Sequence, residues 1–131
     1  MSIPRIYKDL INGLLQKSMS KEVNWDVTTN ANVFVVYFKE SSLILNQHNN
    51  QNEAWISVDL IDYKGDIIDG FWVSGDESED WNVVSELFSL ARRSALAIDN
   101  TIQGMLKEIN KDGIVGEKKR KDDEFTDDIP F

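Results

Sequence analysis

Apolar residues near the start of the chain recur at the spacing of an α-helix. Ile6, Leu10 and Leu14 stand four positions apart and, with Ile11 and Leu15 beside them, form one stripe. Pro4 precedes them, and proline is favoured in the first helical turn because its missing N–H has no intrahelical partner there. The pattern predicts a helix over residues 4 to 19.

From Val23 the apolar period changes to two, which is typical of β-strands. Gly65 in the segment YKGD supplies the positive φ that a tight hairpin turn needs. The segment NQHNNQNE, residues 46–53, is predicted to be a polar loop. We expect about five strands in an antiparallel meander, over residues 23–27, 33–40, 42–45, 54–62 and 66–74.

The strand over residues 54–62 shows which face of this sheet is buried. Ile56 and Val58 point to one face, whereas Ser57 and Asp59 point to the other, so one face must be covered. A later apolar run that steps by four and three is expected to cover it. Its members are Val84, Phe88, Ala91, Ala95, Ile98, Ile102, Met105 and Ile109.

This run predicts a helix that begins near Trp81, with Ser78 among its candidate caps. The spacing fits either one long helix packed on the sheet or a coiled-coil seam over residues 84–109 that joins two copies of the chain. Additional leucines broaden the stripe beyond a coiled-coil seam, which favours packing on the sheet. Polar residues and a glycine in its middle leave open a break near 98–100 into two helices.

Together these elements predict an α+β protein with an N-terminal helix, an antiparallel meander and a C-terminal helix or helix pair packed on one sheet face. Of the 131 residues, 1–113 are expected to form a single domain. Residues 114–131 are charged and aperiodic, and we expect them to form a disordered acidic tail.

Composition and charge exclude several classes of function. The chain has no Cys, which rules out disulfides, thiolate zinc sites and a cysteine nucleophile. Charges interrupt the apolar N-terminal segment, so we expect neither a signal peptide nor a membrane span and a cytoplasmic location. The net charge is −9, and residues 1–116 carry −7 of it. A domain with this charge repels the phosphate backbone, which disfavours direct binding to nucleic acid.

The sequence offers little for catalysis. His48 is the only histidine and falls in the predicted polar loop, and Ser74 lies between glycines without the strand, turn and helix of a nucleophile elbow. We expect no enzymatic activity, no metal and no cofactor. Because few cations accompany the aromatic residues, we expect these rings to lie in the core and not to stack on bases. They are Trp25, Tyr37, Phe38, Trp55, Trp72 and Trp81.

The segment LFSLARRSALAIDNTIQGML, together with the N-terminal helix and a strand that bears tryptophan, is similar to small uncharacterised bacterial domains, some of them carried by mobile elements. This resemblance implies a fold and no function.

The last five residues, DDIPF, closely resemble the C-terminal tip of bacterial single-stranded-DNA-binding proteins. In that family the tip docks on replication, recombination and repair proteins. The resemblance implies that Phe131 inserts its ring into an apolar pocket while its carboxylate meets a cation. Pro130 would fix the backbone and Ile129 would pack beside it. Asp127 and Asp128 would steer the segment to a basic rim.

The sequence therefore predicts a non-enzymatic accessory or adaptor protein, from a phage or mobile element, that engages the partners of single-stranded-DNA-binding-protein tails. Two alternatives remain. The domain could bind another protein through its sheet or helix face while the tail only increases solubility. The chain could also bind single-stranded DNA directly, with the tail regulating that binding.

Overall fold

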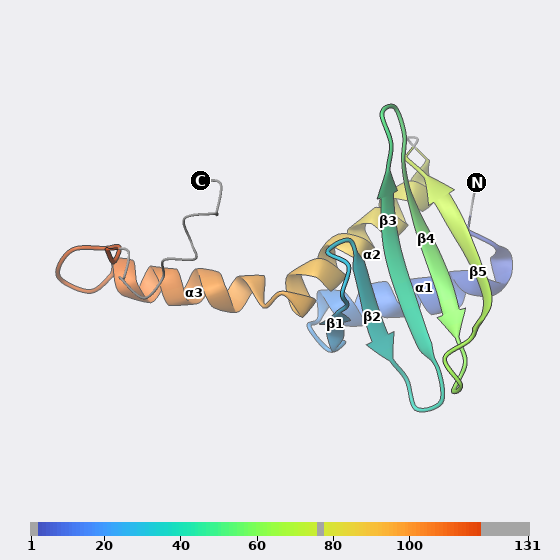
Figure 1. The fold of residues 1–131 in the computed structure, drawn as a ribbon, viewed down its shortest axis with the longest axis horizontal. Helices are drawn as coiled ribbons and strands as arrows, with labels where there is room; N and C mark the ends of the chain where they lie inside the picture. Colours follow the sequence, from blue (N-terminus) through green and yellow to red (C-terminus); the bar gives the residue numbers. More distant parts are fainter. Residues whose placement is uncertain (1–2, 76–77, 119–131) are drawn as a thin grey trace. The chain divides into compact units, whose positions relative to one another are not determined.

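The computed structural model describes residues 3–75 and 78–118, and it confirms the α+β class (Figure 1). An N-terminal helix precedes five antiparallel strands and two further helices. These elements are α1 (Arg5–Met19), β1 (Trp25–Val27), β2 (Val33–Tyr37), β3 (Ser42–Asn49), β4 (Ala54–Ile61), β5 (Ile67–Ser74), α2 (Glu79–Ala95) and α3 (Ile98–Ile109). The chain divides into two compact units, residues 1–99 and residues 100–131.

The five strands form one sheet in the order β1-β2-β3-β4-β5, which is the predicted meander. Gly65 turns the hairpin between β4 and β5 with a φ of 90°. The predicted loop over residues 46–53 is wrong in its first half, because β3 continues to Asn49. Asn46, Gln47 and His48 pair with Ser57, Ile56 and Trp55 of β4. The long partner strand extends β3 despite its polar sequence, since pairing satisfies the backbone N–H and C=O groups.

Helices α1 and α2 lie on the same side of the sheet, and the other face of the sheet is turned toward the viewer in Figure 1. The core forms between these helices and the covered face, which confirms the alternation expected for β4. Its fully buried members include Ile11 of α1, Ile56 and Val58 of β4, and Val84 and Leu87 of α2. The rings of Phe34 and Phe88 meet edge to face across this interface, with centroids 5.4 Å apart.

Two hydrogen bonds satisfy polar groups at the borders of the core. The Trp25 indole N–H donates to Ser18 Oγ at 2.9 Å, so the one buried polar residue of the described core has a partner. The Tyr7 hydroxyl donates to Asp69 Oδ2 at 2.5 Å and joins α1 to β5. Burial, followed by this bond, raises the pKa of Tyr7 to about 12.

The C-terminal apolar run forms two helices, α2 and α3, which agrees with the alternative of a break into two helices. The Ser78 side chain caps the start of α2 by accepting from the Trp81 N–H. At the other end the chain leaves the helix at Leu96, and Ala97 adopts the left-handed region with a φ of 52°. The expectation that the whole run packs on the sheet holds for α2 only. Helix α3 buries none of its residues.

Candidate functional site

The residues predicted to bind a partner, Asp127, Asp128, Ile129, Pro130 and Phe131, lie outside the described residues. So does most of the tail that we expected to be disordered. Among the described residues, the candidate site lies on the sheet face that α1 and α2 leave uncovered.

An aromatic cleft of about 320 Å³ opens on this face, where β4 begins and β5 ends. The aromatic cleft is lined by four residues, Glu53, Trp55, Trp72 and Ser74. The antiparallel register explains their proximity, because Trp55 pairs with Ser74 and Ser57 pairs with Trp72. Residues two apart on a strand share a face, so both indoles lie on the side opposite Ile56 and Val73. Trp72 is 45 % exposed.

His48 supports this cleft from β3. Its imidazole stacks on the Trp55 ring, with centroids 5.1 Å apart and planes within 10°, and its Nε2 is 3.1 Å from Ser57 Oγ. The prediction of a solvated loop histidine is therefore wrong, since cross-strand pairing places His48 on the sheet. The contact with Ser57 and the stacking on Trp55 together hold the imidazole in one orientation, so His48 in turn limits the motion of the Trp55 ring.

Asp59 lies on the same face, two residues beyond Ser57. Partial burial raises the pKa of its carboxyl, and the nearby charge of His48 acts in the opposite direction. Gly70, directly across on β5, makes room for this side chain. A Cβ at Gly70 would stand 2.6 Å from Asp59 Oδ1 and 2.6 Å from the Val58 carbonyl oxygen. The Asp59 carboxylate is thus built into the sheet surface, and it adds negative charge to the uncovered face.

A larger cavity of about 520 Å³ lies between α1, the segment that leads into β1 and the end of β2. Apolar side chains of Leu10, Leu14, Val36 and Phe38 form part of its wall, with Lys17 at the same cavity. Lys17 also lies 4.0 Å from Glu22, so its charge is already partly balanced. The cavity therefore has a partly apolar wall, and the carboxylates of Asp9 and Glu22 line it together with Lys17.

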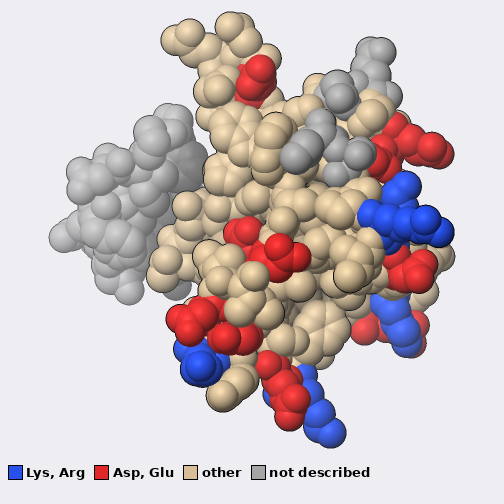
Figure 2. All heavy atoms as spheres, turned by 90° about the vertical axis from the view of Figure 1, so that its right-hand side faces the viewer, with Lys and Arg blue, Asp and Glu red and all other residues tan. Residues whose placement is uncertain are grey.

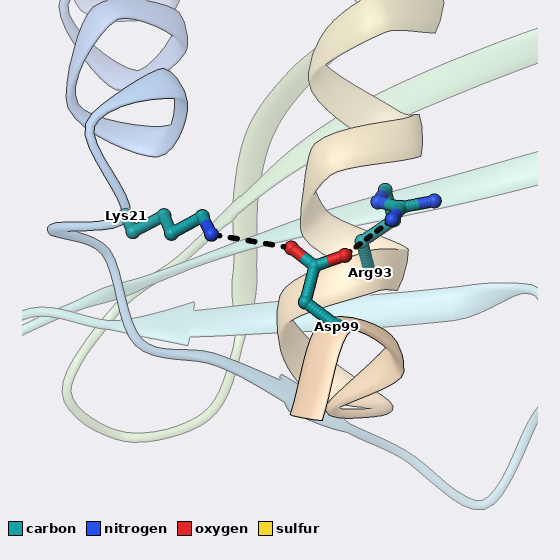
Figure 3. Close-up of polar contacts among 3 residues, drawn as sticks. All are labelled: Lys21, Arg93 and Asp99. Atoms are coloured by element: carbon teal, nitrogen blue, oxygen red, sulfur yellow. Dashed lines mark hydrogen bonds and ion pairs between the residues drawn. The ribbon is translucent and has the colours of Figure 1, made fainter. Parts of the chain in front are cut away.

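A third cluster holds the end of α2. Asp99 lies between Lys21 and Arg93, as Figure 3 shows, with Lys21 Nζ at 3.4 Å from Asp99 Oδ2 and Arg93 donating to Asp99 Oδ1. The Arg93 hydrogen bond, with Lys21 in support, holds the pKa of the Asp99 carboxyl below its usual range. All three side chains are well exposed, which fits a local brace on the residues next to Ala97.

The expectation that the aromatic side chains lie in the core holds for two of the six. Trp25 is buried and Trp81 packs partly buried against the core. Tyr37, Phe38 and Trp72 are exposed, and Trp55 is half-buried on the uncovered face. The sequence did contain the relevant signal. Trp55 and Trp72 have the same alternation phase as Ser57, opposite to Ile56 and Phe71, and this phase places them away from the helices.

Within residues 3–75 and 78–118, no group of three or more His, Asp and Glu side chains is placed to hold a metal ion. Over the same residues, none of the helices has the length and apolar character that crossing a bilayer requires.

The fold and the cleft together define the class: an α+β protein whose antiparallel sheet has two helices on one face and an anionic aromatic cleft on the other. No protein-family model, curated protein or solved structure matches the chain.

Proposed function

We propose that the protein is a non-enzymatic accessory or adaptor protein of a phage or mobile element. Its C-terminal residues would engage replication, recombination or repair proteins that recognise the tails of single-stranded-DNA-binding proteins. The observation that carries this proposal is the sequence DDIPF at 127–131, preceded by further acids at 122–124.

The chemistry of this segment suits capture by a pocket with a basic rim. Phe131 supplies a large apolar ring next to a carboxylate, and the carboxylate can form charge-assisted hydrogen bonds with Arg or Lys. Pro130 restricts the backbone and so lowers the entropy lost on binding. Asp127 and Asp128 attract the segment to positive charge and increase the association rate.

Magnitudes indicate a weak contact. Burial of the Phe131 side chain contributes roughly 1.5 to 3 kcal/mol, and each charge-assisted hydrogen bond adds about 1.5 to 3 kcal/mol. Association costs at least about 4 kcal/mol. Binding in the high-micromolar range or weaker is therefore expected, and a durable complex needs a second contact or more than one tail.

The test is a competition assay with a labelled DDIPF peptide bound to a protein that recognises such tails. We expect the intact chain to displace the peptide and a chain without Phe131 to lose this ability. Phe125→Ala is the matched control, because it removes a tail phenylalanine outside the tip. A variant with two residues added after Phe131 tests the requirement for a free carboxylate. Equal displacement by all of these chains would refute the proposal.

A second candidate, a protein-binding module that acts through its sheet face, is supported by the aromatic cleft. Under this hypothesis, deletion of residues 126–131 leaves every pull-down partner in place. A steep loss of single-stranded DNA binding with added salt, measured by electrophoretic shift, would instead favour tail-regulated binding to DNA.

A further inference from the structure

The aromatic cleft combines two indole rings with the Glu53 carboxylate, and its four lining residues include no Lys or Arg. The imidazole of His48 lies beside it, stacked on Trp55. Strands β3, β4 and β5 contain no Lys or Arg. Asp59 of β4 lies on this uncovered face, and Glu53 lies at the cleft itself. Figure 2 looks onto the β5 side of the molecule, and carboxylates lie well inside this view. The described cations that it shows stand toward its margins.

An exposed indole next to a carboxylate attracts a cation by two independent effects. The face of tryptophan carries the most negative quadrupole among the aromatic side chains, so it binds ammonium and guanidinium groups. The Glu53 carboxylate adds direct charge attraction and can accept their hydrogen bonds. Trp55 is held in place by the His48 imidazole on one face, so little side-chain entropy is lost when a ligand binds.

We propose that this cleft binds the cationic side chain, arginine or lysine, of an extended segment from a partner protein. The position of the cleft favours a protein segment over a free organic cation. β5 is an edge strand of the sheet, and its outer backbone groups can pair with an added strand. An exposed ring contributes only about a twofold to fivefold gain in affinity. A free cation with two such rings would therefore bind weakly, whereas backbone pairing along β5 supplies the remaining contacts.

This inference does not depend on the C-terminal tip, since no tail residue takes part. It does offer the second contact that a weak tip would need. The experiment below can refute this proposal without testing the proposed function, because the peptide it uses cannot bind the C-terminal tip.

The experiment is an NMR titration of the full chain with a short blocked peptide that has one central arginine between valine and threonine. The chain has four tryptophans, so the indole N–H signals of Trp25 and Trp81 serve as internal references for Trp55 and Trp72. We expect shifts at Trp55 and Trp72 and at backbone amides of β5. Peptides with lysine and with neutral norleucine in place of arginine complete the series, and choline represents a free organic cation.

Variants identify the residues responsible. Trp72→Leu and Glu53→Gln are each expected to weaken arginine-peptide binding about twofold to fivefold. Tyr63→Leu is the matched control, because Tyr63 is 78 % exposed and lies in the turn at the other end of β4 and β5. Circular dichroism confirms that each variant is folded.

Three results would overturn the proposal: equal shifts with the norleucine peptide, tighter binding of choline than of the arginine peptide, or unchanged affinity in both cleft variants. Removal of residues 117–131 provides a further check. If this truncation alone shifts the Trp72 indole and increases peptide affinity, the chain's own basic segment occupies the cleft, and the assignment to a partner is wrong.

Discussion

Helices α2 and α3 carry the same apolar spacing, but the apolar stripe is buried on α2 and exposed on α3. The residues of the run on α2, such as Val84, Phe88 and Ala91, are buried against the sheet and α1. The stripe continues on α3 through Ile102, Met105 and Ile109, yet all three are at least 43 % exposed. Periodicity defines the face of a helix that needs a partner, but it does not say whether the same chain supplies that partner.

The contrast also limits where the predicted self-association through residues 84–109 can occur. The α2 part of this stripe is buried in the core of its own chain, so α3 carries the exposed part of the stripe. What stays a prediction is contact between two copies through α3. A helix of 12 residues is about 18 Å long at 1.5 Å per residue, so such a contact would be small.

The largest expected effect compares one substitution in the two helices. Leu87 is 0 % exposed and Leu106 is 43 % exposed. Leu87→Ala leaves a cavity in the core and should lower the free energy of unfolding by about 2 to 5 kcal/mol. Leu106→Ala should lower it by less than about 1 kcal/mol, since the site is open to solvent. Urea denaturation measures both, and equal losses would contradict the distinction between α2 and α3.

The next prediction addresses self-association. If α3 of one copy pairs with α3 of another, Met105→Glu places a charge in the apolar contact and should raise the dissociation constant at least about tenfold, or about 1.4 kcal/mol. Gln103→Glu introduces the same charge outside the stripe and is the matched control. Sedimentation equilibrium decides the matter. A wild-type chain that stays monomeric at millimolar concentration would remove the hypothesis.

The boundary between the two helices gives a third prediction. Ala97 has a φ of 52°, which costs a residue with a Cβ roughly 1 to 2 kcal/mol, and β-branched residues tolerate it least. Ala97→Val should therefore destabilise the protein by about 1 kcal/mol, whereas Ala97→Gly should not. The side chain is exposed, so packing does not confuse the comparison. Similar denaturation midpoints for Val and Gly would show that this backbone conformation is not maintained.

The smallest effect comes from the hydrogen bond that joins α1 to β5 at the border of the core. Tyr7→Phe removes the hydrogen bond to Asp69 and should cost about 1 kcal/mol. Because the pKa of Tyr7 is raised to about 12, folding favours the neutral phenol. This contribution is complete below about pH 10, the usual tyrosine pKa, and is lost as pH rises from there toward 12.

Denaturation as a function of pH measures this contribution. The Tyr7→Phe protein should lack the part of the alkaline decline that ionisation of Tyr7 causes. An identical decline in the two proteins would assign the loss of stability to other groups.

The uncovered sheet face was harder to predict than the fold. Alternation placed Trp55 and Trp72 opposite the core residues, but composition suggested that large aromatic rings are buried, and the two signals conflicted. His48 was assigned to a loop because its neighbours are Asn and Gln, and only pairing with β4 places it on Trp55. The cleft joins residues from β4 and β5 with the end of the β3–β4 loop, so no local pattern contains it.

By itself, the sequence determined the elements that depend on near neighbours. The existence of α1, the phase of β4 and the turn at Gly65 follow from local sterics and periodicity. The buried face of α1 does not, because Ile6 of the predicted stripe is exposed, and α2 begins at Glu79, slightly before the predicted start near Trp81. Tertiary structure alone decided which apolar stripe is buried, how far β3 extends and where the indoles meet. The physical reason is that burial and strand pairing depend on surfaces supplied by distant segments, whereas backbone preference depends on adjacent residues.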